Sequence, residues 1–156
     1  MWCDLSKEWQ IAFEEAWISF KGGSIPIGAI ITDEDGNVLM TGRNESGEGR
    51  YPNHRVAHAE ASCVRNLDIE KYPNLSEYHL YTTMEPCPMC MGAIINARIK
   101  RLVYGASDPK NGACGSVADL SAMSFTHRIE VEKGFMAEEC ADELKAFFRK
   151  LRESKQ

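Results

Sequence analysis

The stretch from Thr82 to Ile94, TTMEPCPMCMGAI, sets Cys87 and Cys90 three positions apart, directly after a Glu-Pro step. Residues at this spacing share one face of a helix, and a helix N-terminus favours the thiolate form of cysteine. Two thiols in this pattern bind a metal, form a redox pair or simply pack in a core. The choice between these interpretations depends on which other residues accompany the pair.

The composition places limits on the class of protein. The 156 residues are enough for a buried core, and we expect residues 1–156 to form a single domain. The net charge of −5 argues against a strongly basic nucleic-acid-binding protein. No run of about 18 apolar residues indicates a membrane span, and the first residues, MWCDLSKEWQ, do not resemble a secretory signal. The six cysteines therefore predict reduced thiols or metal ligands in a cytoplasmic protein.

The periodicity of apolar residues predicts alternating helices and strands. A first amphipathic helix ends at Gly22-Gly23, and its apolar positions are Trp9, Phe13, Ala16, Trp17 and Phe20. The β-rich runs 25–32 and 37–44 are joined by DEDG, which predicts a hairpin, and residues 45–55 read as a polar loop. Strands are also predicted at 78–84, 101–106 and 128–134, with a helix at 87–97. Two further helices are expected, one at 58–67 with Ala61, Val64 and Leu67 on one side, and a last one that turns Cys140, Leu144, Phe147, Phe148 and Leu151 inward.

This order of elements predicts the fold class. Strands that alternate with helices indicate an α/β domain with helices on both faces of a sheet. We therefore expect a three-layer α/β/α arrangement around a central mixed sheet of about five strands.

A metal site is predicted by residues upstream of the cysteine pair. His58 and Glu60 stand in VAHAEA near a predicted helix start, and one histidine nitrogen with two cysteine sulfurs suits zinc. Three ligands leave the fourth tetrahedral position open, which is typical of catalytic zinc. Glu60 lies two residues from a ligand, where it can take a proton from water and pass it to a leaving group. A redox pair leaves the His-x-Glu pattern unexplained, and a non-catalytic zinc module needs neither Glu60 nor an open position.

The chain resembles a known superfamily in these residues. HAE, then 25 residues, then PCPMC is similar to the zinc-dependent cytidine/deoxycytidylate and adenosine deaminases. The segments PIGAI, GRN, LYTTMEPCPMC and GASDPKNGACGS occur in the same order as in that superfamily. The resemblance implies a cytidine deaminase-like fold, a homodimer, and one Zn²⁺ per subunit held by His58, Cys87 and Cys90. It also implies that Glu60 shuttles protons as hydroxide attacks the carbon bearing an exocyclic amine, and that ammonia leaves.

The same resemblance suggests roles for residues around the pocket. Asn44 would hydrogen-bond the edge of a base, although a turn residue is the alternative, and Ile27 would form an apolar wall. Backbone N–H groups of Ala59 and Cys87 would orient the substrate. The remaining pocket candidates are Pro86, Asp108 (alternatively a turn or cap residue), Glu85 (a brace of the zinc loop or an exposed carboxylate) and His54 in the preceding loop.

Other cysteines and histidines receive no catalytic role. We expect four cysteines to be packing thiols: Cys3, Cys63, Cys114 and Cys140. His79 and His127 are expected to be surface residues or to be satisfied by hydrogen bonds.

Two substrates are suggested by different halves of the chain. The C-terminal half resembles bacterial tRNA adenosine deaminases, which convert wobble adenosine to inosine. There Lys145, Arg149 and Arg152 form a stripe that could touch phosphates, but we favour a solvated helix face. In the N-terminal half, the residues before Ala-His-Ala-Glu are His-Arg-Val rather than the Asp-Pro-Thr usual in those enzymes. The N-terminal half resembles small-molecule nucleobase and nucleoside deaminases instead. We therefore predict a free nucleobase or nucleoside as substrate, with tRNA as the alternative.

Overall fold

The computed structural model describes residues 5–154, so Cys3 lies outside the described part. Four helices are found there: α1 (Lys7–Lys21), α2 (Ala59–Asn66), α3 (Pro88–Asn96) and α4 (Ala137–Glu153). The strands are β1 (Gly28–Thr32), β2 (Val38–Arg43), β3 (His79–Met84), β4 (Arg101–Ala106) and β5 (Glu130–Lys133). Short 3₁₀ turns are η2 (His54–Val56), η3 (Leu75–Glu77) and η4 (Leu120–Ala122). Every predicted helix and strand is present, with slightly different bounds. No helix within residues 5–154 has the length and apolar content needed to cross a membrane.

The strands form one mixed sheet in the order β2-β1-β3-β4-β5. β1 pairs antiparallel with β2 and β3, whereas β3 with β4 and β4 with β5 are parallel. The β1–β2 hairpin turns at Gly36, whose φ of +82° is a conformation that glycine adopts without steric cost. Parallel strands need a crossover connection, and α3 provides it between β3 and β4. The predicted five-stranded mixed sheet is confirmed.

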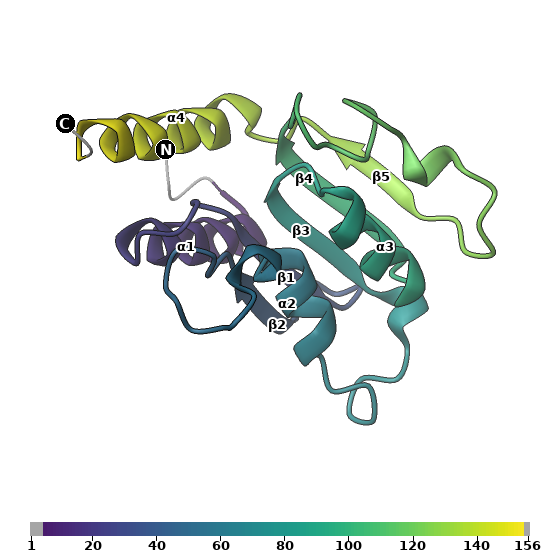
Figure 1. Cartoon of the computed structure of the whole chain (residues 1–156). Coiled ribbons are helices and arrows are strands. Elements are labelled where there is room, and N and C mark those ends of the chain that lie inside the picture. Colours follow the sequence, from purple (N-terminus) through teal and green to yellow (C-terminus); the bar gives the residue numbers. More distant parts are fainter. Residues whose placement is uncertain (1–4, 155–156) are drawn as a thin grey trace.

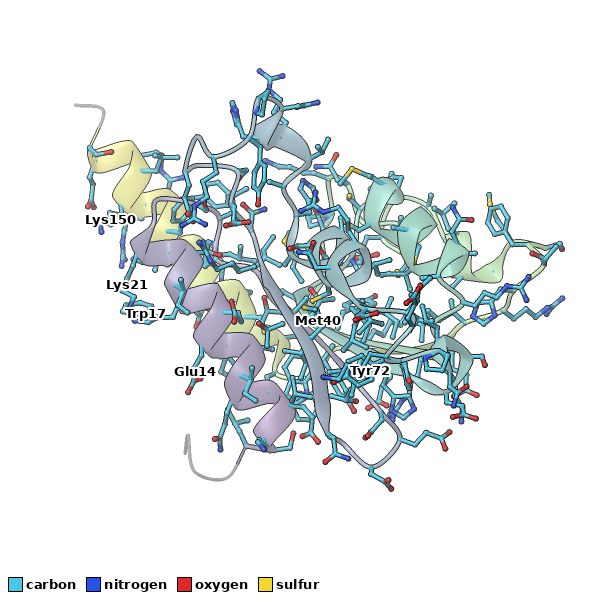
Figure 2. The ribbon with its side chains drawn as sticks, turned by 90° about the horizontal axis from the view of Figure 1, so that it is seen from below. Glu14, Trp17, Lys21, Met40, Tyr72 and Lys150 are labelled. Carbon is cyan, nitrogen blue, oxygen red and sulfur yellow. The ribbon has the colours of Figure 1, made fainter. Side chains whose placement is uncertain are left out.

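Helices cover both faces of this sheet, because successive side chains of a strand point to opposite sides. On one face Ile31 packs with Cys63 of α2 and with residues of α3. On the other face Ile30 packs with Trp9 of α1 and Leu144 of α4. Figure 1 shows α2 and α3 in front of the sheet, and Figure 2 shows α1 and α4 side by side. This confirms the predicted three-layer α/β/α arrangement.

In three helices, some apolar residues expected on the inward side are exposed or only partly buried. Trp17 of α1 is 51% exposed, and Phe148 and Leu151 of α4 are 41% and 39% exposed. The C-terminal ends of both helices extend past the sheet (Figure 1), so apolar spacing continues there without a sheet beneath it. Trp17 instead stacks on Phe20, with ring centroids 5.3 Å apart. In α2 the fully or nearly buried residues include Ala59, Glu60 and Cys63, while Ala61 and Val64 are only partly buried.

The packing cysteines are placed as predicted. Cys63 and Cys114 belong to the core beneath α2 and α3, and Cys140 belongs to the core beneath α1 and α4. All three are free thiols. His127 is satisfied, since its Nε2 lies 2.7 Å from the carbonyl oxygen of Ile99.

Candidate active site

The three predicted metal ligands meet where two helices begin. His58 is the N-cap residue of α2, Cys87 is the N-cap residue of α3, and Pro88 starts α3 with a fixed φ. The His58 Nδ1 atom lies 3.5 Å from the Sγ atoms of both Cys87 and Cys90. Both helix dipoles therefore point their positive ends at the same small volume, which favours thiolates there.

The spacing of these atoms fits zinc. Tetrahedral geometry with Zn–S of about 2.3 Å and Zn–N of about 2.05 Å requires a sulfur-to-nitrogen separation of about 3.6 Å. The two observed separations of 3.5 Å agree with that value. The three ligand atoms are within 4.8 Å of one another, and His58, Cys87 and Cys90 are the three residues of the group. The donor set and its geometry thus suit a zinc ion with one open coordination position.

The electrostatics of the ligands favour a charged sulfur at the centre. Hydrogen bonding from Cys90, and then from His58, lowers the pKa of the Cys87 thiol to about 4. The same hydrogen bond to Cys87, together with burial, raises the pKa of Cys90. The pKa of His58 is raised by its hydrogen bond with Cys87. Cys87 is therefore the thiol that ionises first, in the form that binds metals.

Glu60 lies beside the ligands on the first turn of α2. It is only 3% exposed, and Thr82 Oγ1 donates a hydrogen bond of 3.2 Å to its Oε1. Burial raises the pKa of its carboxyl above the ordinary value. A carboxyl with a raised pKa binds a proton more readily than an exposed one, which suits a group that takes up and returns a proton in general acid–base chemistry.

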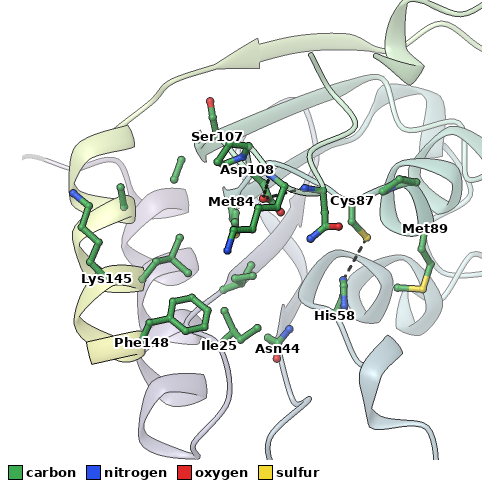
Figure 3. A pocket seen from close by; sticks show the side chains of 18 of the residues that line it. Ile25, Asn44, His58, Met84, Cys87, Met89, Ser107, Asp108, Lys145 and Phe148 are labelled. Atoms are coloured by element: carbon green, nitrogen blue, oxygen red, sulfur yellow. Dashed lines mark hydrogen bonds between the residues drawn. The ribbon is translucent and has the colours of Figure 1, made fainter. Parts of the chain in front are cut away.

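A cavity of about 1020 Å³ opens over this centre (Figure 3). Five of the predicted site residues line it: Ile27, Asn44, His58, Cys87 and Asp108. Glu60 and Cys90 are buried and are not among the lining residues. Figure 3 shows Lys145 and Phe148 of α4 across the cavity from His58 and Cys87. The volume is large enough for a base together with part of what it is attached to.

Asn44 directs a free hydrogen-bond donor toward this cavity. Its Oδ1 accepts hydrogen bonds from Ser46, at 3.0 Å from the backbone N and 2.6 Å from Oγ. Its own backbone is fixed by bonds to Ile27 and Ser19. The Nδ2 group makes no hydrogen bond with any other residue between 5 and 154, and the residue lines the cavity. This arrangement fits the predicted contact with the edge of a base.

The Glu85 carboxylate fixes the loop that follows β4. Its two oxygens accept from the backbone N–H groups of Asp108 (2.9 Å), Cys114 (3.0 Å) and Ser116 (3.1 Å), and from the Ser116 hydroxyl. Burial alone would raise the pKa of Glu85, but these hydrogen bonds outweigh it, so the pKa is lowered. Gly112 is required here, because a Cβ at that position would lie 2.4 Å from the Glu85 carboxyl carbon. Glu85 thus braces the loop 107–116 beside the zinc site.

The other predicted pocket residues differ in position. Asp108 lines the cavity and also accepts hydrogen bonds from the N–H groups of Lys110 and Asn111, so it serves a turn as well. Ala59 and Pro86 are buried and are not in the cavity lining. His54 is exposed in η2 and does not line the cavity either.

Four basic residues at the cavity were not predicted as a group. They come from η2, from the loop 107–116 and from α4, and we call them the cationic rim: Arg55, Lys110, Lys145 and Arg152. The predicted stripe on α4 is thus split, because Lys145 and Arg152 line the cavity and Arg149 does not. Both residues are exposed, as expected for a solvated helix face, and they line the cavity as well. Only Lys145 and Arg152 share a helical spacing, and Arg55 and Lys110 lie far from them in the sequence.

A known family matches this chain over residues 4–106, the zinc-binding region of cytidine and deoxycytidylate deaminases. The protein belongs to the cytidine and deoxycytidylate deaminase family. It is therefore a member of a family of zinc-binding hydrolytic deaminases, as the residues around His58 and Cys87 predicted.

Proteins that resemble this chain in sequence or in fold differ in substrate. The chain is 45% identical, over 85% of its length and 76% of the relative, to the tRNA-specific adenosine deaminase of Haemophilus influenzae. A solved structure from a study of A-to-I editing by tRNA:A34 deaminases superposes with a TM-score of 0.76 at 35% identity, covering 87% of this chain and 97% of that one. The guanine deaminase of Nitrosomonas europaea has a TM-score of 0.67 at 21% identity over 91% of this chain and 84% of its own, which shows a shared fold.

Proposed function

We propose that the protein is a hydrolytic tRNA adenosine deaminase that converts an adenosine of a tRNA to inosine. The similarity to a tRNA-specific adenosine deaminase and to a solved tRNA:A34 deaminase supports this substrate. It is better supported than the small-molecule substrate that the residues before His58 suggested. The homodimer and the single domain stay predictions.

The observation that carries the proposal is the cationic rim. Four positive side chains face one cavity that also holds Asp108, in a chain whose net charge is −5. A free base or nucleoside has no negative charge to be attracted by such a rim, whereas each nucleotide of RNA brings a phosphate. A base in such a cavity is turned out of its stack, so we expect the nucleotides that flank it to lie at the mouth of the cavity, where the rim would meet their phosphates.

The ligands and the acid–base group divide the chemistry. His58, Cys87 and Cys90 would hold zinc, which when bound lowers the pKa of water and supplies the nucleophile. Asn44 would donate from Nδ2 to the ring edge and so fix the base over the centre. Apolar Ile27 would pack on the base and exclude bulk water.

Glu60 would move both protons of the attacking water. The water oxygen bonds to the carbon that carries the amine, and Glu60 delivers one proton to the adjacent ring nitrogen. The second proton then goes to the amine, the carbon–nitrogen bond breaks, and ammonia leaves while the oxygen becomes the carbonyl of inosine. A non-catalytic zinc module would have no use for a buried carboxyl at this place, so the position of Glu60 supports catalysis.

Ammonia release from a panel of substrates tests the proposal. The panel holds an anticodon-arm RNA with a wobble adenosine, free adenosine, adenine, guanine, cytosine and cytidine, and each is incubated with the zinc-loaded protein. We expect turnover of the RNA far above that of any free base or nucleoside, with inosine found by mass spectrometry of the digested RNA. Turnover of guanine or cytidine alone, with the RNA unchanged, would contradict the proposal.

A further inference from the structure

The segment 44–58 joins β2 to α2, and three of its residues line the cavity. It begins at Asn44, carries Arg55 to the cavity and ends at His58, the nitrogen ligand. Apart from the turn η2 it has no regular structure to fix it. Its position therefore depends on individual hydrogen bonds and ion pairs of its backbone and side chains.

A partly buried ion-pair cluster holds the first half of this segment. The two Nη atoms of Arg43 grip the carboxylate of Glu48, with Nη2 2.9 Å from Oε2, and Nη2 also lies 3.2 Å from Glu45 Oε1. Arg50 contacts the same two carboxylates at 3.3 Å. The side chains of Arg43, Glu45 and Glu48 are 16%, 12% and 13% exposed, so solvent screens these contacts less than at the surface. Hydrogen bonding to Glu48 raises the pKa of Arg43.

Glu45 connects this cluster to the zinc ligand. Its backbone N–H donates a 2.9 Å hydrogen bond to the carbonyl of Ala57, the residue before His58. Its carboxylate is held at the same time by Arg43, by Arg50 and by a 3.1 Å hydrogen bond from the Tyr51 hydroxyl. A shift of Glu45 therefore moves the start of the segment and the residue next to the ligand together.

The cluster is also seated against the end of α1. The Ser19 hydroxyl donates to the Asn44 carbonyl at 2.7 Å, and the Gly47 N–H donates to Ser24 Oγ at 2.9 Å. Glu48 fits over Gly22, where a Cβ would lie 2.7 Å from Glu48 Oε1. These contacts hold the first residues of the segment against the end of α1.

We propose that Arg43 is a positioning residue: with Glu45 and Glu48 it holds the segment 44–58 so that Asn44, Arg55 and His58 face the cavity. The proposal rests on the proposed function only for the choice of substrate. Arg43 touches none of the cavity, so it acts through Glu45 and not on the substrate itself.

The test compares Arg43→Gln with a matched control, Lys100→Gln. The control removes an ion pair of Lys100 with Glu34 whose side chains are 40% and 52% exposed and which does not involve the cavity. Three readouts are taken well below the unfolding temperature: trypsin cleavage after Arg50 and Arg55, zinc release to a chelator, and kcat and KM with anticodon-arm RNA. Trypsin and the chelator need no nucleic acid, so they remain informative even if RNA is not the substrate.

For Arg43→Gln we expect cleavage at the two sites and zinc release to be faster and kcat/KM to fall, each by roughly tenfold, as when supports of a metal site are removed. Arg43→Lys keeps the charge without the two-pronged contact and should lie between Arg43→Gln and the native protein. Lys100→Gln should leave all three readouts unchanged. A folded Arg43→Gln protein with a lower Tm but native cleavage, zinc release and kcat/KM would overturn the proposal.

A milder variant covers the case in which Arg43→Gln does not fold. Tyr51→Phe removes a single hydrogen bond to Glu45 and keeps every charge. We expect cleavage after Arg50 and Arg55 to become about threefold faster, in keeping with the loss of one hydrogen bond. Native cleavage rates in this variant would then overturn the proposal.

Discussion

The floor and the rim of the cavity are built in opposite ways. The floor, by which we mean the metal centre beneath the cavity (His58, Glu60, Cys87 and Cys90), lies at the starts of two helices, and Cys90 and Glu60 are 0% and 3% exposed. The cationic rim is exposed and comes from a short turn, a loop and the last helix, from which Figure 3 shows Lys145. The chemistry therefore depends on rigid, buried geometry, whereas the choice of substrate depends on surface charges. Variants of each part should fail in different ways.

The largest effect is expected at the floor, from Glu60→Gln. An amide has the shape of the carboxyl but cannot carry a proton, so kcat should fall by roughly a thousandfold. RNA affinity and zinc content should change little, since the rim and the ligands are intact. Product formation under single-turnover conditions measures this loss. Glu34→Gln, at an exposed carboxylate, is the control, and native kcat in Glu60→Gln would refute the proton shuttle.

At the rim we expect a smaller effect that depends on substrate and salt. Lys145 is 75% exposed and its ion pair with Asp142 is easily exchanged for a phosphate. The double variant Lys145→Gln/Arg152→Gln should lower kcat/KM for anticodon-arm RNA by roughly thirtyfold. The slope of log binding constant against log salt concentration should become shallower by the amount expected for about two phosphate contacts. With free adenosine, for which we expect a low rate, the variant and the native protein should have the same rate. Binding titrations at several salt concentrations measure the slope, and an unchanged slope would remove these residues from the RNA site.

Between floor and rim, Glu85 offers a test of the loop 107–116. Glu85→Gln keeps the size of the side chain but loses the charge that accepts four hydrogen bonds. Because hydrogen bonds to charged groups are the stronger ones, the free energy of unfolding should fall by about 2 kcal/mol. Denaturant unfolding followed by circular dichroism measures it. A change close to zero would show that the loop is held by other contacts.

The smallest effect is a pH dependence from Glu143 on α4. Partial burial raises the pKa of its carboxyl to about 7. The folded protein therefore binds this proton more tightly than the unfolded chain, so the contribution of Glu143 to stability falls as pH rises from about 4.5 to about 7. Glu143→Gln should raise Tm relative to the native protein at pH 8 and by much less at pH 5. A Tm difference that is equal at the two pH values would contradict this assignment.

The same contrast explains what the sequence could predict. His58, Glu60, Cys87 and Cys90 sit in two short segments with fixed spacing, because the starts of helices determine their geometry locally. The sheet and its helices were predicted for a similar reason, since periodicity is a local signal. The floor and the fold could thus be predicted from residues that lie close together in the sequence.

The rim and the segment 44–58 could not be predicted in this way. Arg55, Lys110 and Lys145 meet only after folding, and before that each looks like an ordinary surface residue. Arg43, Glu45 and Glu48 sit in or beside a stretch that reads as a polar loop, with no helical or strand period to suggest an ion-pair cluster. Apolar Trp17 and Phe148 misled the prediction because helical spacing does not reveal where the sheet ends beneath a helix.

The central claim is tested most directly by mapping inosine in a tRNA transcript that carries a wobble adenosine. The zinc-loaded protein is compared with its Glu60→Gln variant, and ammonia is measured in the same reactions. We predict inosine at that single adenosine, ammonia in equal amount, and neither product with Glu60→Gln. An unchanged transcript, from a protein that releases ammonia from a free base or nucleoside, would contradict the account.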